Sequence, residues 1–390
     1  MKQETGALDR RLPTASMLQV TRSLPSNAEP DWKPAQSTVP ASIYIDPARY
    51  ALETERLFLT LPIPIAPSVM VAAGSFVCRE GFGKPLLLTR DRSGKAHVFL
   101  NTCRHRGSQL TDAQTPEHKA LIVCPYHAWS YDLSGQLRAV PREETFESLD
   151  KGNLGLKELP SIEEGGLIWA KLGSEPTDDF SHVTTALIEE LDAVGLSGMH
   201  LFAHRKHHVD GNWKLVMDTF LEGYHVTRLH AKTLGHLFED AVVRVDQFGA
   251  HLRQTSGRLK FEPSIVPENP SISELRKIVT FVYTLMPYGV VICSPDYVNV
   301  LLMLPQGTDK TLVENFMLTD CEPATDKARE RWNRSLALTD ETTFLEDFAA
   351  ANASHIGLKT GATNELILGG YEQAIKIYHE HVERLLHVQA

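Results

Sequence analysis

Cysteine is scarce in this sequence. The 390 residues include five cysteines, at positions 78, 103, 124, 293 and 321. An odd and sparse set in a long chain excludes a disulfide-stabilised framework and fits a reducing compartment. We therefore expect a cytoplasmic protein.

Positive charge is also in deficit, with 39 Lys and Arg against 49 Asp and Glu, a net charge of −10. This balance excludes a broad nucleic-acid-binding face. The first thirteen residues are charged and lack the apolar run of a secretory signal. Residues 57–78 carry no charge and are long enough to span a bilayer, but three prolines within six positions exclude a regular helix there. We expect neither a nucleic-acid partner nor a membrane partner.

Several catalytic motifs are missing as well. No Gly-x-Gly-x-x-Gly follows a strand-like run, and there is no P-loop or Gly-x-Ser-x-Gly elbow. The chain thus has no Rossmann motif for NAD(P)H and no serine-nucleophile signature. His379-Glu380-His381 could bind a metal, but we expect it to be the solvated face of a last helix, over 371–388.

The order of segments predicts an α+β protein. Residues 1–42 contain five prolines and predict an extended N-terminal arm. In 43–68, Asp46-Pro47 predicts a capped helix running to about residue 58. Residues 69–167 predict a small all-β domain with hairpins over 85–100 and 129–140. Residues 168–390 predict helices over 183–196, 213–224 and 340–356 and strands within 279–319.

Two Cys-His pairs lie in the β domain. Cys103 and His105 form a Cys-x-His pair, and Cys124 and His127 form a Cys-x2-His pair. Each pair follows a strand-like run, so the two loops can converge on one metal centre. Two thiolates and two imidazoles suit a tetrahedral zinc site or a [2Fe–2S] cluster in which two Cys bind one iron and two His the other.

A second group of candidate ligands lies at Glu222, His225 and His230. His225 and His230 are five residues apart, roughly 140° around a regular helix, so the helix should end or bulge near 223–230. Two His with a distant carboxylate form the facial triad of non-haem Fe(II) oxygenases, which leaves coordination positions open for O₂.

Both groups resemble the alpha subunits of Rieske non-haem iron oxygenases, of the aromatic-ring-hydroxylating type. The resemblance is carried by Cys103-Arg-His-Arg-Gly, by Cys124-Pro-Tyr-His-Ala-Trp-Ser-Tyr and by the run from Asn212 to His230. It implies an all-β Rieske [2Fe–2S] domain (69–167) and a catalytic mononuclear-iron domain (168–390) with an antiparallel sheet surrounded by helices. Ala128 stands where the family usually has Gly, and because Ala is small we expect little consequence.

The resemblance also implies a third iron ligand far downstream. On a helix from about residue 339, Asp347 shares an apolar stripe with Phe344, Phe348 and Ala351, whereas Glu346 is turned about 100° away. We therefore select Asp347 and expect Glu346→Ala to do little. Glu222 corresponds to the family's carboxylate between a His ligand of the iron and a Rieske His of the neighbouring subunit. A homotrimer is implied, and a beta subunit is left open.

These features predict a terminal oxygenase. Electrons from NAD(P)H would arrive through a separate reductase, with or without a ferredoxin, and O₂ would be activated at mononuclear Fe(II) to hydroxylate a small organic substrate. We favour aromatic chemistry, with oxidative demethylation of an N- or O-methylated molecule as the alternative. The alternative of another class is a zinc hydrolase or structural zinc protein. A pure electron carrier would not need the second His pair.

Overall fold

The computed structural model describes residues 11–26, 34–173 and 177–387, in two compact units. One unit is drawn from 1–57 and 181–390, and the other comprises 58–180. The 58–180 unit encloses the predicted domain of 69–167 and adds short segments at both of its ends. The two units are described separately.

The 58–180 unit is built from three small antiparallel sheets. Their strands are β2 (Ile63–Pro67), β3 (Ser75–Gly81), β4 (Lys84–Arg90), β5 (Ala96–Leu100), β6 (Glu117–His118), β7 (Leu121–Val123), β8 (Ser130–Asp132), β9 (Leu137–Ala139), β10 (Ser161–Glu164) and β11 (Leu167–Ala170). The two predicted hairpins are confirmed as β4–β5 and β8–β9. Asp91 closes the first, because its carboxylate accepts hydrogen bonds from the backbone of Ser93 and Lys95.

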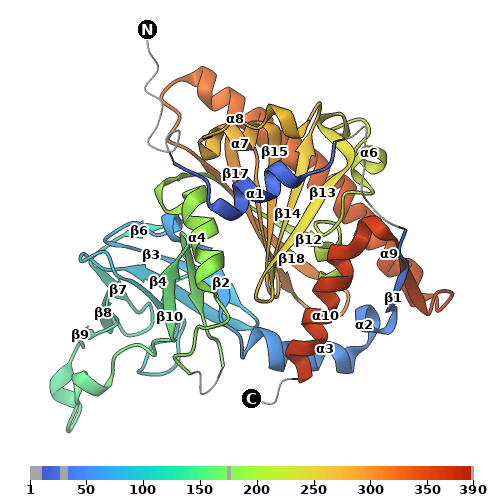
Figure 1. Ribbon diagram of the computed structural model, residues 1–390. Coiled ribbons are helices and arrows are strands. Elements are labelled where there is room, and N and C mark those ends of the chain that lie inside the picture. Colours follow the sequence, from blue (N-terminus) through green and yellow to red (C-terminus); the bar gives the residue numbers. More distant parts are fainter. Residues whose placement is uncertain (1–10, 27–33, 174–176, 388–390) are drawn as a thin grey trace. The chain divides into compact units, whose positions relative to one another are not determined.

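A seven-stranded antiparallel sheet forms the centre of the other unit, in the order β12-β18-β17-β16-β15-β14-β13 (Figure 1). The strands are β12 (His200–Val209), β13 (Phe238–Phe248), β14 (His251–Arg258), β15 (Val279–Leu285), β16 (Gly289–Cys293), β17 (Tyr297–Pro305) and β18 (Thr311–Thr319). Four of them confirm the strands predicted within 279–319.

Helices pack around this sheet. They are α1 (Ala15–Ser23), α2 (Ser42–Ile45), α3 (Pro47–Glu53), α4 (Thr185–Val194), α5 (Trp213–Asp218), α6 (Val226–Leu229), α7 (Ile272–Ile278), α8 (Asp326–Thr339), α9 (Phe348–Lys359) and α10 (Gln373–His387). Helix α4 anchors to one face, where Glu190 bonds both Arg253 and Tyr283. Because side chains alternate along a strand, the neighbours of Arg253 on β14 point to the opposite face.

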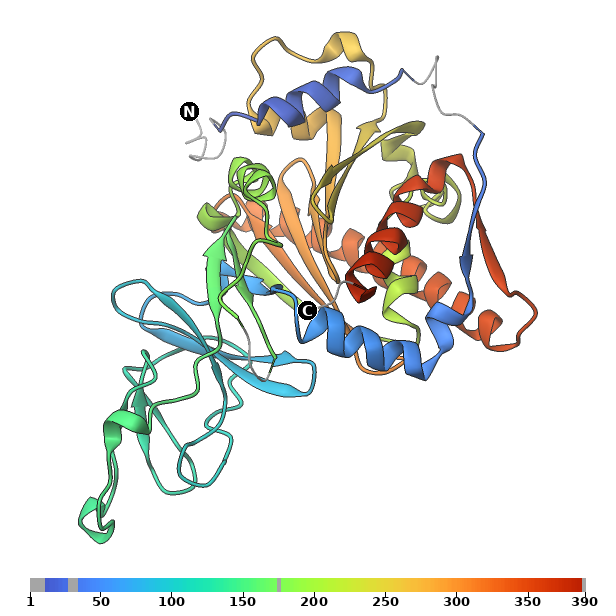
Figure 2. The ribbon, with the colours of Figure 1, turned by 60° about the horizontal axis from the view of Figure 1, so that its bottom comes forward.

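The N-terminal segment differs from the predicted extended arm. Thr14 caps helix α1 by accepting a hydrogen bond from the backbone of Met17, and Met17 and Val20 are buried. Further on, β1 (Ser37–Pro40) pairs with β19 (Glu365–Leu368), and helix α10 packs beside both strands (Figure 2). The prolines of this segment lie outside α1, so they delimit the helix and do not prevent it.

The C-terminal helices also depart from expectation. The helix predicted from about residue 339 already begins at Asp326 as α8, continues through the π-helical segment η9 (Asp340–Asp347) and ends with α9. Helix α10 confirms the predicted last helix. However, His379 and His381, expected on its solvated face, are 5% and 3% exposed. His379 bonds Asp218 and His381 bonds the carbonyl of Ala250, because tertiary packing covers this side of the helix.

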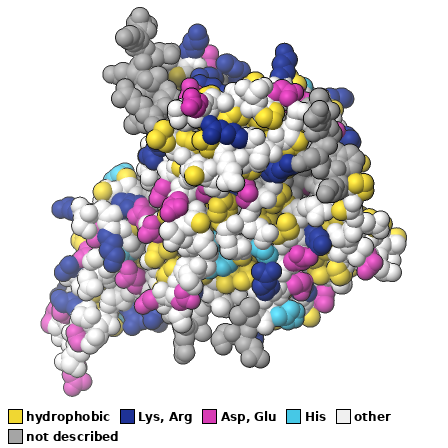
Figure 3. Space-filling view, in the orientation of Figure 1, with side chains coloured by type: hydrophobic (Ala, Val, Ile, Leu, Met, Phe, Trp, Pro, Cys, Tyr) yellow, Lys and Arg dark blue, Asp and Glu magenta, His cyan; other side chains and the backbone are white. Residues whose placement is uncertain are grey.

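Acidic and basic side chains are interspersed on the face shown in Figure 3. Within the described ranges, no helix has the length and apolar character needed to cross a bilayer. The uncharged stretch 57–78 contains strand β2 and part of β3 in place of a long helix. The prolines of this stretch exclude a long regular helix there.

Candidate metal centres

Two loops of the 58–180 unit share one backbone pattern. After β5, the N–H of Cys103 donates to the carbonyl of Ser108 at 2.8 Å, and the N–H of Gly107 donates to the carbonyl of Cys103 at 3.0 Å. After β7, the loop that starts at Cys124 makes the same two bonds, at 2.8 and 3.0 Å. Each loop therefore curls around a cysteine and carries a histidine two or three residues beyond it.

The four candidate ligands differ in burial. Cys103 and Cys124 are 3% and 2% exposed, whereas the His105 ring is half-buried and the His127 ring exposed. The two rings lie 4.6 Å apart between centroids. Burial raises the pKa of Cys103, and Tyr131 places its hydroxyl 3.4 Å from that sulfur. Buried thiolates are stabilised by metal cations, which suits these two cysteines as ligands.

The spacing of these donors bears on which metal they suit. The four ligands of a tetrahedral zinc ion lie within about 4 Å of one another, given its short bonds. Among the described residues, the one group of three or more His, Cys, Asp or Glu donors that all lie within 4.8 Å is His225, His230 and Asp347. In a [2Fe–2S] cluster of the Rieske type the four ligands are divided between two irons, so two Cys-His pairs on separate loops suit it.

We expected little consequence of Ala128 because its side chain is small, but its backbone conformation also matters. Its φ is +58°, and the matching residue of the first loop, Gly107, has φ +72°. A glycine adopts this left-handed region freely, whereas a residue with a Cβ pays about 1 kcal/mol or more. The family's glycine is therefore explained by backbone freedom, and Ala128 carries a conformational cost.

The early end of helix α5 positions the two histidines of the second site. The helix predicted to reach Tyr224 ends at Asp218, and Gln254 holds the following turn by donating to the carbonyl of Phe220 at 2.7 Å. His225 and His230 then flank the short helix α6. Their ring centroids lie 5.1 Å apart, a separation that an unbroken helix would not give.

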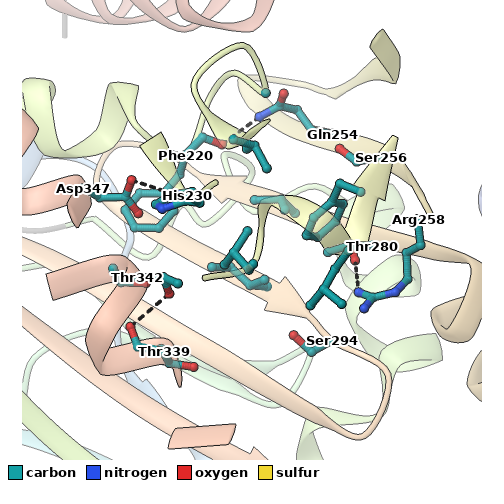
Figure 4. Close-up of a pocket in the computed structure, with 18 of the residues that line it drawn as sticks. Phe220, His230, Gln254, Ser256, Arg258, Thr280, Ser294, Thr339, Thr342 and Asp347 are labelled. Atoms are coloured by element: carbon teal, nitrogen blue, oxygen red, sulfur yellow. Dashed lines mark hydrogen bonds and ion pairs between the residues drawn. The ribbon is translucent and has the colours of Figure 1, made fainter. Parts of the chain in front are cut away.

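Asp347 reaches the same point from segment η9 (Figure 4). Its Oδ1 lies 3.0 Å from Nε2 of His230 and 3.5 Å from Nε2 of His225. The carboxylate is 5% exposed, and this oxygen makes no hydrogen bond of good geometry with any described group. A buried oxygen facing two ring nitrogens without a donor is suited to a cation between them.

The other nitrogen of each ring is held by a carboxylate. Nδ1 of His225 contacts Oε1 of Glu222, and Nδ1 of His230 lies 2.6 Å from Oε2 of Glu346. The hydroxyl of Thr233 donates to the same Glu346 oxygen at 2.7 Å. With Nδ1–H donated to a carboxylate, each Nε2 keeps its lone pair for a metal.

The electrostatics of the site are those expected of a cation-binding site. Burial raises the pKa of Asp347, because its charge is poorly solvated. Burial lowers the pKa of His230, but the carboxylates of Asp347 and Glu346 outweigh this effect and the net shift is upward. A bound divalent cation would hold Asp347 ionised and His230 neutral.

A cavity of about 320 Å³ opens beside these residues. Its floor is one face of the sheet, where Gln254, Val282, Ile292 and Asn299 are successive cross-strand partners on β14 to β17. The cavity lies within one unit and has the size of a small-molecule site. His225, His230 and Asp347 all line it.

From helix phase we expected Glu346 to point away from the metal site and its substitution to have little effect. The structure instead places its carboxylate against Nδ1 of His230. Glu346→Gln is expected to weaken mononuclear iron binding by about 10- to 100-fold, because the amide holds the imidazole less strongly. Thr233→Val should produce a smaller loss in the same direction. Iron titration of metal-free protein measures both affinities. An unchanged iron affinity in Glu346→Gln would show that Glu346 does not orient His230 for iron binding.

The sequence offered Glu346 only as a candidate iron ligand, and it gave no signal for Thr233. Glu346 stands next to the selected aspartate, and only the π-helical segment brings both carboxylates towards one histidine. In η9 the backbone turn is wider than in an α-helix, so phase counted at 100° per residue misjudges direction. The acidic pair itself was the one available hint.

Family models match the two parts of the chain in which these centres lie. Residues 62–160 match the Rieske [2Fe-2S] domain, and residues 196–387 match the ring hydroxylating alpha subunit (catalytic domain). The chain thus contains a Rieske domain and a catalytic domain of the ring-hydroxylating alpha-subunit type.

Two curated relatives are each similar to about half of this chain. The glycine betaine monooxygenase oxygenase subunit of Chromohalobacter salexigens is 31% identical over 212 residues, 52% of this chain and 45% of that protein. The anthranilate 1,2-dioxygenase large subunit of Acinetobacter baylyi is 29% identical over 202 residues, 48% of this chain and 41% of that protein. The chain spans about half the length of the curated relatives it matches.

Among solved structures, the quaternary ammonium Rieske monooxygenase CntA in complex with L-carnitine superposes with a TM-score of 0.75 at 20% identity. The match covers 93% of this chain and 98% of that chain. At this identity the likeness concerns the fold, and it agrees with the predicted combination of an all-β domain and an α+β catalytic domain.

Proposed function

We propose that this protein is the terminal oxygenase component of a Rieske oxygenase system. The observation that carries the proposal is the convergence of His225, His230 and the buried Asp347 carboxylate on one point beside a cavity. Cys103, His105, Cys124 and His127 would hold the [2Fe–2S] cluster. His225, His230 and Asp347 would hold mononuclear iron.

Iron bound by two histidines and a carboxylate supplies open positions for O₂, and the cluster supplies electrons. The protein's own groups set up the site. Glu222 and Glu346 each keep a proton on Nδ1 of one histidine, so that both Nε2 atoms face Asp347. The apolar and neutral polar floor of the cavity holds an organic molecule and limits the water beside it.

The reaction on the substrate is proposed as monooxygenation of an N-methylated small molecule. Relatives named as monooxygenases of glycine betaine and carnitine support this alternative over the aromatic chemistry favoured from the sequence. A relative named for anthranilate keeps ring dihydroxylation as the second candidate. Product analysis with both substrate types, using a reductase and NAD(P)H, distinguishes a demethylated product from a diol.

Partners and location are also proposals. A separate reductase, with or without a ferredoxin, would deliver electrons, since the sequence has no Rossmann motif. A homotrimer would bring the cluster of one subunit to Glu222 of the next. The cytoplasmic location rests on the five cysteines, which are all unpaired.

Metal analysis tests the proposal directly. The purified protein should contain three irons and two acid-labile sulfides per chain, as one two-iron cluster and one mononuclear site require. Its brown colour should bleach with dithionite. Stoichiometric zinc without sulfide would overturn the oxygenase function and favour the zinc alternatives.

A further inference from the structure

Arg258 is a lone cation in the cavity. It lies on β14, and its guanidinium donates to the hydroxyl of Thr280 at 3.1 Å and lies 5.2 Å from the ring centroid of Phe238. Both partners are neutral. Across the described ranges, no carboxylate oxygen lies within 4.0 Å of its nitrogens.

The carboxylates around this cavity are engaged elsewhere. Glu222 contacts His225, Asp347 faces the two histidines, and Glu239 accepts a hydrogen bond from the backbone of Lys260. Asp296 also lines the cavity and favours the charge of Arg258 from a distance, but its carboxylate makes a direct ion pair with Arg331 at 2.9 Å. The guanidinium therefore keeps donors that no protein anion uses.

Such a group calls for a ligand anion. Arg258 is half-buried, and burial lowers its pKa, yet arginine stays protonated in proteins. A charge withdrawn from water without a counter-charge in direct contact is unfavourable, and the planar guanidinium matches a carboxylate in two parallel hydrogen bonds.

The position of Arg258 fits the direction of the cavity. In Figure 4, His230 and Asp347 lie at one end of the drawn pocket, and Arg258 lies at the other, with Thr280 and Ser294. A molecule held at Arg258 by one end would extend its remaining atoms towards the two metal ligands. Two fixed points of this kind orient a small substrate for reaction at one position.

We propose that Arg258 binds a carboxylate of the substrate, so that the substrates are small organic carboxylates. The inference rests on the proposed oxygenase function, because it takes the cavity ligand to be the substrate. Betaines and aromatic acids are the two sources of such an acid. Their shared chemistry is the carboxylate, and Thr280 and Ser294 supply neutral hydroxyls beside it.

The test measures binding to the iron-loaded protein without O₂ or reductase. Glycine betaine, L-carnitine and anthranilate are each compared with their primary amide, which keeps the shape and removes the charge. The parent protein should prefer at least one acid to its amide, and the acid that binds identifies the betaine or the aromatic source. Arg258→Gln should weaken that acid by about 30-fold or more and its amide by a few-fold at most.

Two further variants separate recognition from structure. Arg258→Lys should restore part of the affinity for the acid, since it keeps a point charge without the planar fork. Lys260→Gln removes an exposed cation two residues along the chain, outside the cavity lining, and should leave both ligands unaffected. A merely structural role for Arg258 would weaken acid and amide equally.

Some results would overturn the proposal. They are an unchanged acid preference in Arg258→Gln, equal weakening of acid and amide, and failure of every acid in the panel to bind the parent. Iron and sulfide content and substrate-coupled O₂ uptake are measured on the same samples. If these persist while the acid preference is absent, the oxygenase function stands and the substrate class is wrong.

Discussion

Asp347→Ala is expected to remove mononuclear iron from the protein while the Rieske spectrum stays intact. Asp347 supplies the only oxygen donor in the described cluster with His225 and His230, and it is buried. Loss of a direct ligand should weaken iron binding by more than about 100-fold, beyond the effect of a group that only orients a ligand. Activity should fall with the iron. His225→Ala and His230→Ala should behave alike.

The measurement is iron content together with visible absorption and circular dichroism of the cluster. Glu341→Ala is the matched control, because Glu341 lies in the same η9 segment but is exposed and outside the donor group. The cluster ligands belong to a separate compact unit, so cluster loss is not expected. Full iron in folded Asp347→Ala protein would exclude this residue as a ligand.

With ferrous iron supplied in excess, so that any loss of affinity from the weaker hold on His225 is overcome, Glu222→Gln is expected to leave both metal centres filled but to abolish most product formation. Glu222 contacts Nδ1 of His225 through one oxygen and accepts the backbone N–H of His225 at 3.1 Å through the other. Glutamine keeps the shape and part of this bonding but removes the charge that can hold a shared proton. If Glu222 links the centres of neighbouring subunits, electron delivery should slow by on the order of 100-fold or more.

A single-turnover experiment locates the fault. The cluster is reduced, the mononuclear iron is ferrous, and substrate and O₂ are added together. The cluster of the parent should reoxidise within one turnover, whereas that of Glu222→Gln should remain reduced much longer. Glu239→Gln, which alters another carboxylate lining the cavity, should reoxidise like the parent. Equal rates in all three proteins would exclude Glu222 from the electron path.

Local sequence was sufficient to predict much of this protein. Ligand pairs such as Cys103 with His105 are close in the chain, so their spacing alone limits the metals they suit. Hairpins and the Asp46 cap were also predictable, because turns and caps depend on a few neighbouring residues. The α+β class followed from the order of these short-range patterns.

Tertiary structure decided the features that join distant segments. Glu346 orients His230 across 116 positions of sequence, through a π-helical turn that alters helix phase. Strand β1 acquires its partner only when β19 folds beside it, and His379 is buried because Asp218 and Tyr44 meet it there. Arg258 is an ordinary strand residue in the sequence, and only the folded cavity shows that none of the described carboxylates forms a direct ion pair with it. Spacing reports which groups are available, whereas their burial and charge balance depend on contacts that no local pattern encodes.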